Sequence, residues 1–431
     1  MNYFSLNHKA ANVNFEQATI NGIAPDKGLY FPEKLIPLEQ SFFENIEKMS
    51  NTQIAYEVIR QFIATSIPEQ ELSNIIEETL NFEFPLVKIE EDTYALELFH
   101  GPTMAFKDVG ARFMARCLRY FNRSKKDEKI KVLVATSGDT GGAVANGFLR
   151  VKGVEVIILY PSGKVSTIQE KQLTTLGQNI IALEVDGTFD DCQAMVKQAF
   201  LDEDLKELNL TSANSINIAR WLPQMFYFFF AYRDLKHLNK NMVFSVPSGN
   251  FGNICAGMLA KKLGLPIEFF IASTNINDTV ALFLKSGAYQ AKPSTATISN
   301  AMDVGDPSNF VRIQQLYNNE IETLKKDFSS YSFTDEETKN AMKKIYSTAN
   351  YISDPHGAVG YLGWQKTKEK FPNSIGVFLE TAHPVKFLDT VEETLQTKIE
   401  IPQQIKAVID KKKRSLNIKN YKELKAFLTL G

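Results

Sequence analysis

The sequence contains few cysteines and histidines, and their positions argue against several kinds of site. Cys117, Cys192 and Cys255 lie far apart in apolar or helical stretches, which predicts buried free thiols in a reducing compartment. The five histidines show no close ligand spacing, so we expect no catalytic metal. The GxGxxG fingerprint of dinucleotide-binding proteins, the Walker loop and the GxSxG motif of serine hydrolases are also missing.

Long apolar runs and an excess of one charge are missing as well. The most apolar window is 225–232, whereas a membrane-spanning helix needs about 20 residues. The N-terminus lacks a basic region followed by an apolar run, so no signal peptide is expected. Lysine and arginine total 48 against 50 acids, which favours neither nucleic acid nor a membrane surface as the main partner. We therefore expect a cytoplasmic protein, and its 431 residues predict two or three domains.

Two textures divide the chain. The first 90 residues or so contain three segments with apolar residues at helical spacing, at 41–49, 51–65 and 68–80. From about residue 130, short β-branched runs alternate with helical stretches, which predicts parallel sheets covered by helices. The expected strands are 131–136, 154–160, 180–185, 242–246, 267–272 and 375–379. The expected helices between them are 140–151, 165–176, 190–201 and 250–263.

Two glycine-rich turns, at 137–141 and 248–252, each follow an expected strand and open an expected helix. Such a turn presents unpaired backbone N–H groups and the positive end of the helix dipole, so it can bind an anion. The alternative is a tight connection capped by a Ser or Asp side chain. The two turns lie 111 residues apart and predict corresponding points in two α/β lobes.

Lys107 lies in the first turn of a helix expected at 106–120, directly after Gly101 and Pro102. The helix N-terminus disfavours a cation, and the apolar neighbours Met104 and Phe106 add to this effect. Both effects lower the pKa of the amine and make it a better nucleophile toward an aldehyde. The alternative is an exposed lysine paired with Asp108.

A third cluster, at 214–221, offers amide, hydroxyl and guanidinium donors at the entrance to a helix. Arginine can bind phosphate in a bidentate manner, and a helix terminus adds N–H donors. The alternative is helix capping by Asn214 or Asn217, with Arg220 on a solvated face. The sequence thus combines three candidate anion sites with one activated lysine.

Seven ordered motifs resemble those of threonine synthases, which belong to the fold-type II pyridoxal-phosphate enzymes together with the tryptophan synthase β subunit. The motifs occupy 22–32, 100–108, 136–141, 212–217, 246–253, 354–358 and 380–384. The resemblance implies an α/β fold of two lobes with mainly parallel sheets, preceded by a small, mostly helical N-terminal domain. The implied domains are 1–92, a first lobe at 93–235 that bears Lys107, and a second lobe at 236–431.

The resemblance also implies roles for individual residues. Lys107 is implied to bind pyridoxal 5'-phosphate through a Schiff base, and Thr381 to bond the pyridine nitrogen. The implied ligands of the cofactor phosphate are Gly249, Asn250, Phe251 and Asn253. The implied ligands of the substrate are Ser137, Gly138 and Thr140 near its carboxylate, and Asn214, Ser215 and Arg220 near its phosphate. We expect Asp139 to cap the following helix or to bond the ring oxygen of the cofactor.

The implied activity converts O-phospho-L-homoserine and water into L-threonine and phosphate, in a monomer or homodimer. A serine or threonine dehydratase is the nearest alternative, and it needs no site for a substrate phosphate such as the cluster at 214–220. A catalytically silent relative is a second alternative. The presence of Lys107 argues against it, because a silent relative would be free to lose this lysine. A nucleotide-binding oxidoreductase is a third, weakened by the missing fingerprint.

Overall fold

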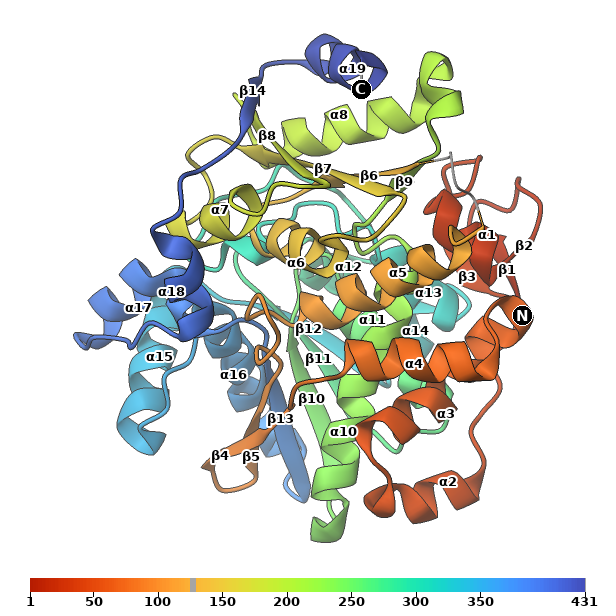
Figure 1. Ribbon diagram of the computed structural model, residues 1–431. Coiled ribbons are helices and arrows are strands. Elements are labelled where there is room, and N and C mark those ends of the chain that lie inside the picture. Colours follow the sequence, from red (N-terminus) through yellow and green to blue (C-terminus); the bar gives the residue numbers. More distant parts are fainter. Residues whose placement is uncertain (125–128, 431) are drawn as a thin grey trace.

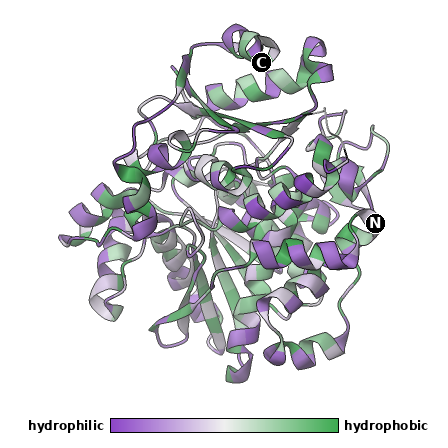
Figure 2. Ribbon diagram, viewed as in Figure 1, coloured by the Kyte–Doolittle hydropathy of each residue, from purple (hydrophilic) through white to green (hydrophobic). Residues whose placement is uncertain are grey.

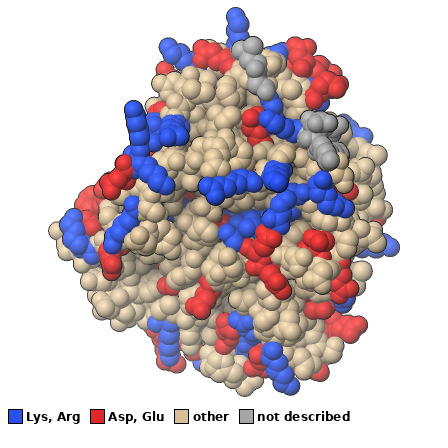
Figure 3. Space-filling view, in the orientation of Figure 1, with Lys and Arg blue, Asp and Glu red and all other residues tan. Residues whose placement is uncertain are grey.

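The computed structural model describes residues 1–124 and 129–430, which form three β-sheets with helices packed around them (Figure 1). Within the described residues, no helix is long and apolar enough to cross a membrane. Lysine and arginine are interspersed with acidic side chains on the face shown in Figure 3, in line with a net charge of −2.

The N-terminal domain contains four α-helices and a small antiparallel sheet of order β2-β1-β3; the first helix packs against this sheet, whereas the third and fourth pack against each other (Figure 1). Its helices lie close to the three expected segments, with one addition at the start. Its strands were not expected, because strands of two to four residues are too short to show alternation. The elements are β1 (Asn2–Ser5), β2 (Val13–Asn14), α1 (Phe15–Asn21), β3 (Tyr30–Pro32), α2 (Gln40–Asn45), α3 (Asn51–Ile63) and α4 (Glu69–Thr79).

The first large sheet is parallel throughout, with order β14-β8-β7-β6-β9. Its strands are β6 (Ile130–Ala135), β7 (Val154–Pro161), β8 (Ile180–Val185), β9 (Leu210–Ser212) and β14 (Leu416–Ile418). Val132 and Val134 belong to the core shared with α5 and α6, whereas Leu133 and Ala135 pack with α8 and α19. Both faces are therefore buried, which explains the continuous apolar strands (Figure 2).

The second large sheet has the order β12-β11-β10-β13-β5-β4 and is parallel except for the β4–β5 pair. Its strands are β4 (Leu86–Glu90), β5 (Thr93–Glu97), β10 (Asn241–Pro247), β11 (Phe269–Thr274), β12 (Phe328–Ser332) and β13 (Ser374–Glu380). Phe244 stacks edge-on against Phe228 on one face, while Val243 packs with Trp364 on the other. This sheet is also covered on both sides.

The remaining helices surround these two sheets. Before β10 they are α5 (Lys107–Phe121), α6 (Asp139–Phe148), α7 (Thr167–Thr174), α8 (Phe189–Leu201), α9 (Ile218–Trp221) and α10 (Phe226–Leu235). After β10 they are α11 (Gly252–Lys262), α12 (Thr279–Ser286), α13 (Phe310–Leu316), α14 (Ile321–Lys325), α15 (Asp335–Ala349), α16 (Pro355–Thr367), α17 (Leu388–Leu395), α18 (Gln403–Ile409) and α19 (Tyr421–Leu430). All expected strands and helices in this region are present, with small shifts at their ends.

The two sheets are not contiguous in the chain. Strand β5 pairs with β13 of the second sheet, and β14 near the C-terminus pairs with β8 of the first (Figure 1). The expected boundaries at 93 and 236 therefore do not separate the sheets. Local periodicity predicts that a strand forms, but it carries no information about which sheet the strand joins.

Candidate active site

Lys107 is the first residue of α5 and is held next to the end of β13 by backbone contacts. The Phe106 N–H donates to the Thr381 carbonyl at 2.9 Å. The Asp108 carboxylate accepts hydrogen bonds from the Thr103 N–H at 2.9 Å and the Thr103 hydroxyl at 2.6 Å. Asp108 is thus occupied by Thr103, and the alternative that Lys107 is an exposed lysine paired with Asp108 is wrong.

The Lys107 amine is an unusual cation. Burial lowers its pKa to about 8; the nearby Asp139 carboxylate opposes this, while the charges of Lys386 and Arg220 add to it. Its Nζ lies 5.5 Å from the centroid of the Phe106 ring and makes no hydrogen bond or ion pair with any described residue. A partnerless, partly buried amine with a lowered pKa is available as a nucleophile and base.

Asp139 forms a buried ion pair instead of capping its helix. The N-cap of α6 is Gly138, which has no side chain, and among the described residues the Asp139 carboxylate accepts no N–H group of the first turn. One Asp139 oxygen lies 2.6 Å from Lys386 Nζ and accepts from Gln169 Nε2 at 3.0 Å. Burial raises the pKa of Asp139, but Lys386 and Lys107 outweigh it and hold that pKa well below its usual range. The capping expectation is wrong because the carboxylate finds a stronger partner in an ammonium group.

Sequence reasoning missed Lys386, although a signal was present. It lies two residues after the 380–384 motif, between the apolar residues Val385 and Phe387. Its side chain is fully buried, and it donates to the Thr103 carbonyl at 3.0 Å as well as contacting Asp139. A lysine in an apolar run rarely becomes buried without a partner, so it could have prompted a search for an acid.

The turn after β6 presents two hydroxyl groups, those of Ser137 and Thr140, which are partly exposed. The Thr136 hydroxyl accepts from the N–H groups of Gly138, at 2.9 Å, and Gly141, at 2.8 Å, and so fixes the turn. Gly138 has φ 138°, and a Cβ there would lie 2.5 Å from the Gln169 amide. Only glycine fits this position, so Gly138 makes the tight turn possible. The Ser137 and Thr140 hydroxyls on this turn could bind an anion.

The turn after β10 is built in the same way. Phe251 has φ 61°, and α11 begins after it without a side-chain cap. The Asn253 amide donates to the Pro247 carbonyl at 2.9 Å and ties the helix to the strand. A Cβ on Gly249 would lie 2.7 Å from the Ala301 carbonyl oxygen. The uncapped first turn of α11 offers main-chain N–H donors suited to a phosphate.

The segment 214–217 lies against this second turn. The Ser215 hydroxyl accepts from the Asn250 amide at 2.9 Å and the Asn309 amide at 3.1 Å. The Asn214 amide donates to the carbonyl of Ala135, the last residue of β6, at 2.9 Å. Hydrogen bonds therefore connect the segment expected to face the substrate phosphate with the turn after β10 and with the end of β6, just before the first glycine-rich turn.

Arg220 and Asn217 are buried, so the alternative that Arg220 lies on a solvated face is wrong. The Arg220 guanidinium donates to the Ala213 carbonyl, and its Nε has no partner among the described residues. Burial lowers the pKa of Arg220 to about 10. The Asn217 side chain accepts from the Ala219 N–H at 3.0 Å and caps α9, so this alternative is confirmed for Asn217.

A second residue missed by sequence reasoning is Arg312, which is fully buried. Its guanidinium donates to the Tyr30 carbonyl at 3.0 Å, the Ile216 carbonyl at 2.7 Å and the Asn309 side chain at 2.7 Å. It thus joins the N-terminal domain to the 214–217 segment. No local pattern could have identified it, because its partners Tyr30 and Ile216 are distant in sequence.

Three family models match successive parts of the chain. The first 80 residues match "Threonine synthase N terminus" over 2–80, and the central part matches "Pyridoxal-phosphate dependent enzyme" over 82–380. The last part matches "Threonine synthase, C-terminal" over 357–428. The chain belongs to the threonine synthase family. The enzymes of this family are pyridoxal-phosphate dependent, and the resemblance seen in the motifs is confirmed.

Relatives and solved structures agree with this threonine synthase assignment. The chain is 45% identical to threonine synthase of Buchnera aphidicola from Acyrthosiphon pisum, over 99% of both chains, and 43% identical to that of Escherichia coli, over 94% of both. The crystal structure of the Escherichia coli threonine synthase matches with a TM-score of 0.94 at 41% identity and covers 100% of both chains. A pyridoxal-phosphate-bound threonine synthase from Brucella melitensis matches with a TM-score of 0.91 at 32% identity, covering 99% of this chain and 98% of that one.

The geometry of the site fits pyridoxal phosphate. The cofactor needs an amine, an anion site for its phosphate and a partner for its ring nitrogen. Lys107 supplies an amine without a partner, and α11 supplies an uncapped helix start. The Thr381 hydroxyl makes no hydrogen bond with a described residue, and its main chain adjoins Phe106. The Lys107 amine, the start of α11 and the Thr381 hydroxyl can therefore supply the three groups that the cofactor needs.

Proposed function

We propose that this chain converts O-phospho-L-homoserine and water into L-threonine and phosphate, with Lys107 as the residue that carries the cofactor. The observation that carries this proposal is the partnerless Lys107 amine with a pKa of about 8, in a chain of the threonine synthase family. A silent binding protein has no need for a buried lysine without an ion pair, because burying an unpaired cation costs stability. The unpaired Lys107 therefore favours an active enzyme over a silent binding protein.

Specific residues would hold the cofactor. The main-chain N–H groups of Gly249, Asn250 and Phe251, together with Asn253, would bind its phosphate at the start of α11. The Thr381 hydroxyl would donate to the ring nitrogen, and Asp139 would lie near the ring oxygen. When bound, pyridoxal phosphate withdraws electrons from the α-carbon of the substrate and so makes its proton removable.

Lys107 would move the protons of the reaction. With a pKa of about 8, roughly one amine in ten is neutral at pH 7, whereas an ordinary lysine is almost wholly charged. Its amine would remove the proton at Cα of the substrate and return one there at the end. A Cβ proton is lost as phosphate leaves from Cγ, Cγ then gains a proton to become the methyl group, and water adds at Cβ to give the hydroxyl of threonine. Burial keeps the pKa of this amine low, and the neighbouring charges of Lys386 and Arg220 add to the effect.

Two groups of donors would orient the substrate. Ser137, Gly138 and Thr140 would bind its carboxylate through hydroxyl and main-chain groups at the start of α6. The phosphate would be bound by Asn214, Ser215 and Arg220, the last through its partnerless Nε. This second group distinguishes the proposal from a serine or threonine dehydratase, whose substrates carry no phosphate.

The decisive experiment combines an absorbance spectrum of the purified protein with a phosphate-release assay on O-phospho-L-homoserine. We expect visible absorbance from the bound cofactor and stoichiometric formation of threonine and phosphate. Lys107→Ala should lose the absorbance of the cofactor–lysine linkage and at least about a thousandfold in turnover. Deamination of serine or threonine without phosphate release would instead identify a dehydratase.

We also propose a cytoplasmic location, a monomer or homodimer, and no nucleic-acid partner. Three buried free cysteines support a reducing compartment. The near balance of 48 basic and 50 acidic residues gives no reason to expect binding of a polyanion. Measurement of the molar mass in solution by light scattering decides between monomer and homodimer.

A further inference from the structure

A cavity of about 1030 Å³ lies where the N-terminal domain meets both lobes. Its walls come from the segment that follows α1, from α8 and from α13. Its inner wall contains Ala135, Ser212 and Asn214, at or just after the ends of β6 and β9, and Asn250 of the turn after β10. The cavity therefore opens onto residues of the candidate active site.

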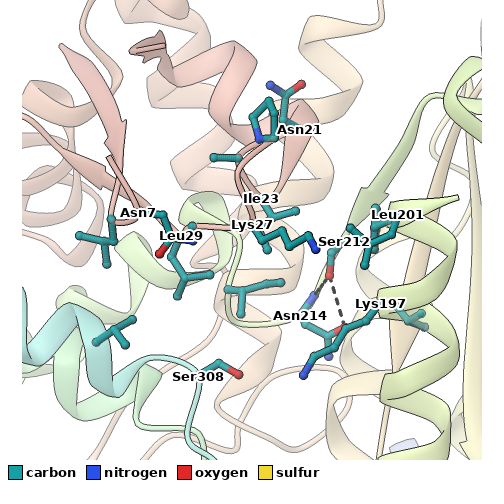
Figure 4. Close-up of a pocket in the computed structure, with 18 of the residues that line it drawn as sticks. Asn7, Asn21, Ile23, Lys27, Leu29, Lys197, Leu201, Ser212, Asn214 and Ser308 are labelled. Atoms are coloured by element: carbon teal, nitrogen blue, oxygen red, sulfur yellow. Dashed lines mark hydrogen bonds between the residues drawn. The ribbon is translucent and has the colours of Figure 1, made fainter. Parts of the chain in front are cut away.

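Two lysines reach into this cavity from different domains. Lys27 extends from the N-terminal domain and Lys197 extends from α8, and both point toward the region of Ser212 and Asn214 (Figure 4). Across the part of the chain that the structure describes, neither amine makes an ion pair or a side-chain hydrogen bond. Both lysines are exposed, so their charges are available to a ligand in the cavity.

The acidic side chain that lines the cavity is already neutralised. Asp202 lies 2.9 Å from Lys425 Nζ and accepts from the Tyr421 hydroxyl at 2.6 Å. The third lining lysine, Lys206, pairs with Glu203. The two lysines described above are therefore left with an uncompensated positive charge, which attracts an anion.

We propose that this cavity admits the phosphorylated substrate and that Lys27 and Lys197 bind its phosphate before it reaches Asn214. The inference rests on the proposed function, which makes the substrate a phosphate monoester with a phosphate charge of about −1.5 to −2. The whole chain has a net charge of −2, so its overall charge does not attract such a substrate. Unpaired lysines in a cavity can still attract the substrate, because salt screens the attraction between two charges only weakly when they are closer than the Debye length.

The apolar part of the cavity fits the same role. Leu201 is 52% exposed and Val311 is 45% exposed, and both line the cavity. Such exposure is unusual for large apolar side chains. It is explained if the cavity must stay open so that a small amino acid can pass through it. A cavity of this size exceeds what one small substrate fills, so it suits a path of entry better than a tight final site.

Steady-state kinetics of the holoenzyme test this proposal. Lys27→Ala and Lys197→Ala should each lower kcat/KM for O-phospho-L-homoserine about threefold, and the double variant about tenfold, with kcat unchanged. The effect should shrink as ionic strength rises, and inorganic phosphate should inhibit the double variant more weakly than the wild type. Matched controls are Lys34→Ala and Lys152→Ala, which remove exposed lysines outside the cavity and should change neither constant.

The outcomes separate this inference from the proposed function. A wild-type enzyme that releases no phosphate from the substrate defeats the proposed function itself. An active wild type whose double variant keeps kcat/KM within twofold at low ionic strength overturns only the role of the two lysines. An equal loss in the control variants would also overturn it, since the effect would then reflect total charge. The absorbance of the bound cofactor should be the same in all variants, which checks that the site is intact.

Discussion

Lys386 Nζ lies 2.6 Å from the Asp139 carboxylate, and the two side chains are 0% and 3% exposed. The pair adjoins Lys107, whose pKa Asp139 raises and Lys386 lowers. A single charge placed beside Lys107 would shift the pKa of the amine strongly, whereas an ion pair shifts it much less because the two effects oppose each other. Because the two charges of the pair nearly cancel at Lys107, burial determines the pKa of the amine and keeps it at about 8.

The variant Lys386→Met should therefore raise the pKa of Lys107 by about one unit or more, because Asp139 is left uncompensated. Asp139→Asn should lower that pKa, because the remaining charge of Lys386 repels a second ammonium group. The pH dependence of the rate at which cofactor-free protein takes up pyridoxal phosphate reports the neutral amine. Its midpoint should move to higher pH in the first variant and to lower pH in the second, while Lys261→Met, far from the site, should leave it in place. Midpoints that coincide in all four proteins would refute the electrostatic role of the pair.

Stability of the cofactor-free protein should also depend on Lys107. Its pKa is about 8 in the folded protein and about 10.4 in an unfolded chain. Between these values the unfolded chain binds more protons, so stability rises with pH across this window, and below pH 8 the folded state carries the cost of a buried ammonium. Lys107→Met should be more stable than the wild type by about 1–2 kcal/mol at pH 7, a value reduced for partial exposure. Urea unfolding at pH 7 and pH 9.5 measures this, and a difference that does not narrow at the higher pH would contradict it.

The turn after β10 should tolerate no side chain at Gly249. A Cβ there would meet the Ala301 carbonyl at 2.7 Å and Met302 Cα at 2.8 Å, and both are backbone atoms that cannot rotate away. Gly249→Ala should weaken cofactor binding by about tenfold to a hundredfold, because the N–H donors shift from the phosphate. Gly142→Ala is a matched control, since its Cβ would lie 3.5 Å from Gln172 in ordinary contact. Equilibrium titration with pyridoxal phosphate compares the two, and equal affinities would refute the assignment of this turn.

Arg312 should contribute strongly to stability. Arg312→Met leaves the Tyr30 and Ile216 carbonyls without their buried donor, which should cost about 2–4 kcal/mol. It also loosens the 214–217 segment, so KM for the substrate should rise. Arg60→Met removes a surface pair with Glu57 and should cost less than about 0.5 kcal/mol. Chemical denaturation of both variants provides the measurement, and similar losses in the two would show that Arg312 is not a structural tie.

The sequence predicted the parts of this fold that depend on local order. The strand 180–185 was placed at its observed bounds, and the helix bearing Lys107 was placed within one residue at each end. Both glycine-rich turns lie at the expected strand ends, because glycine and serine after an apolar run mark such a turn. These features depend on residues that are neighbours in the chain.

The features that were missed depend on partners far apart in sequence. Lys386 is paired with Asp139, Arg312 contacts Tyr30, and β5 joins β13. Periodicity and spacing describe one segment at a time, so they cannot identify contacts of this kind. The capping role expected for Asp139 failed for the same reason, since its actual partner is 247 positions away.

Strand β14 and helix α19 complete the first sheet, although they lie at the C-terminal end of the chain. Lys131 of β6 even donates to the Leu428 carbonyl at 3.0 Å. During synthesis the edge strand and the covering helix of this lobe therefore emerge from the ribosome only after the other four strands of the sheet and the whole second sheet have been made. Until then the edge of β8 and the apolar face beside α8 stay uncovered. A chain that stops at residue 410 would lack both β14 and α19, so this lobe would remain incomplete.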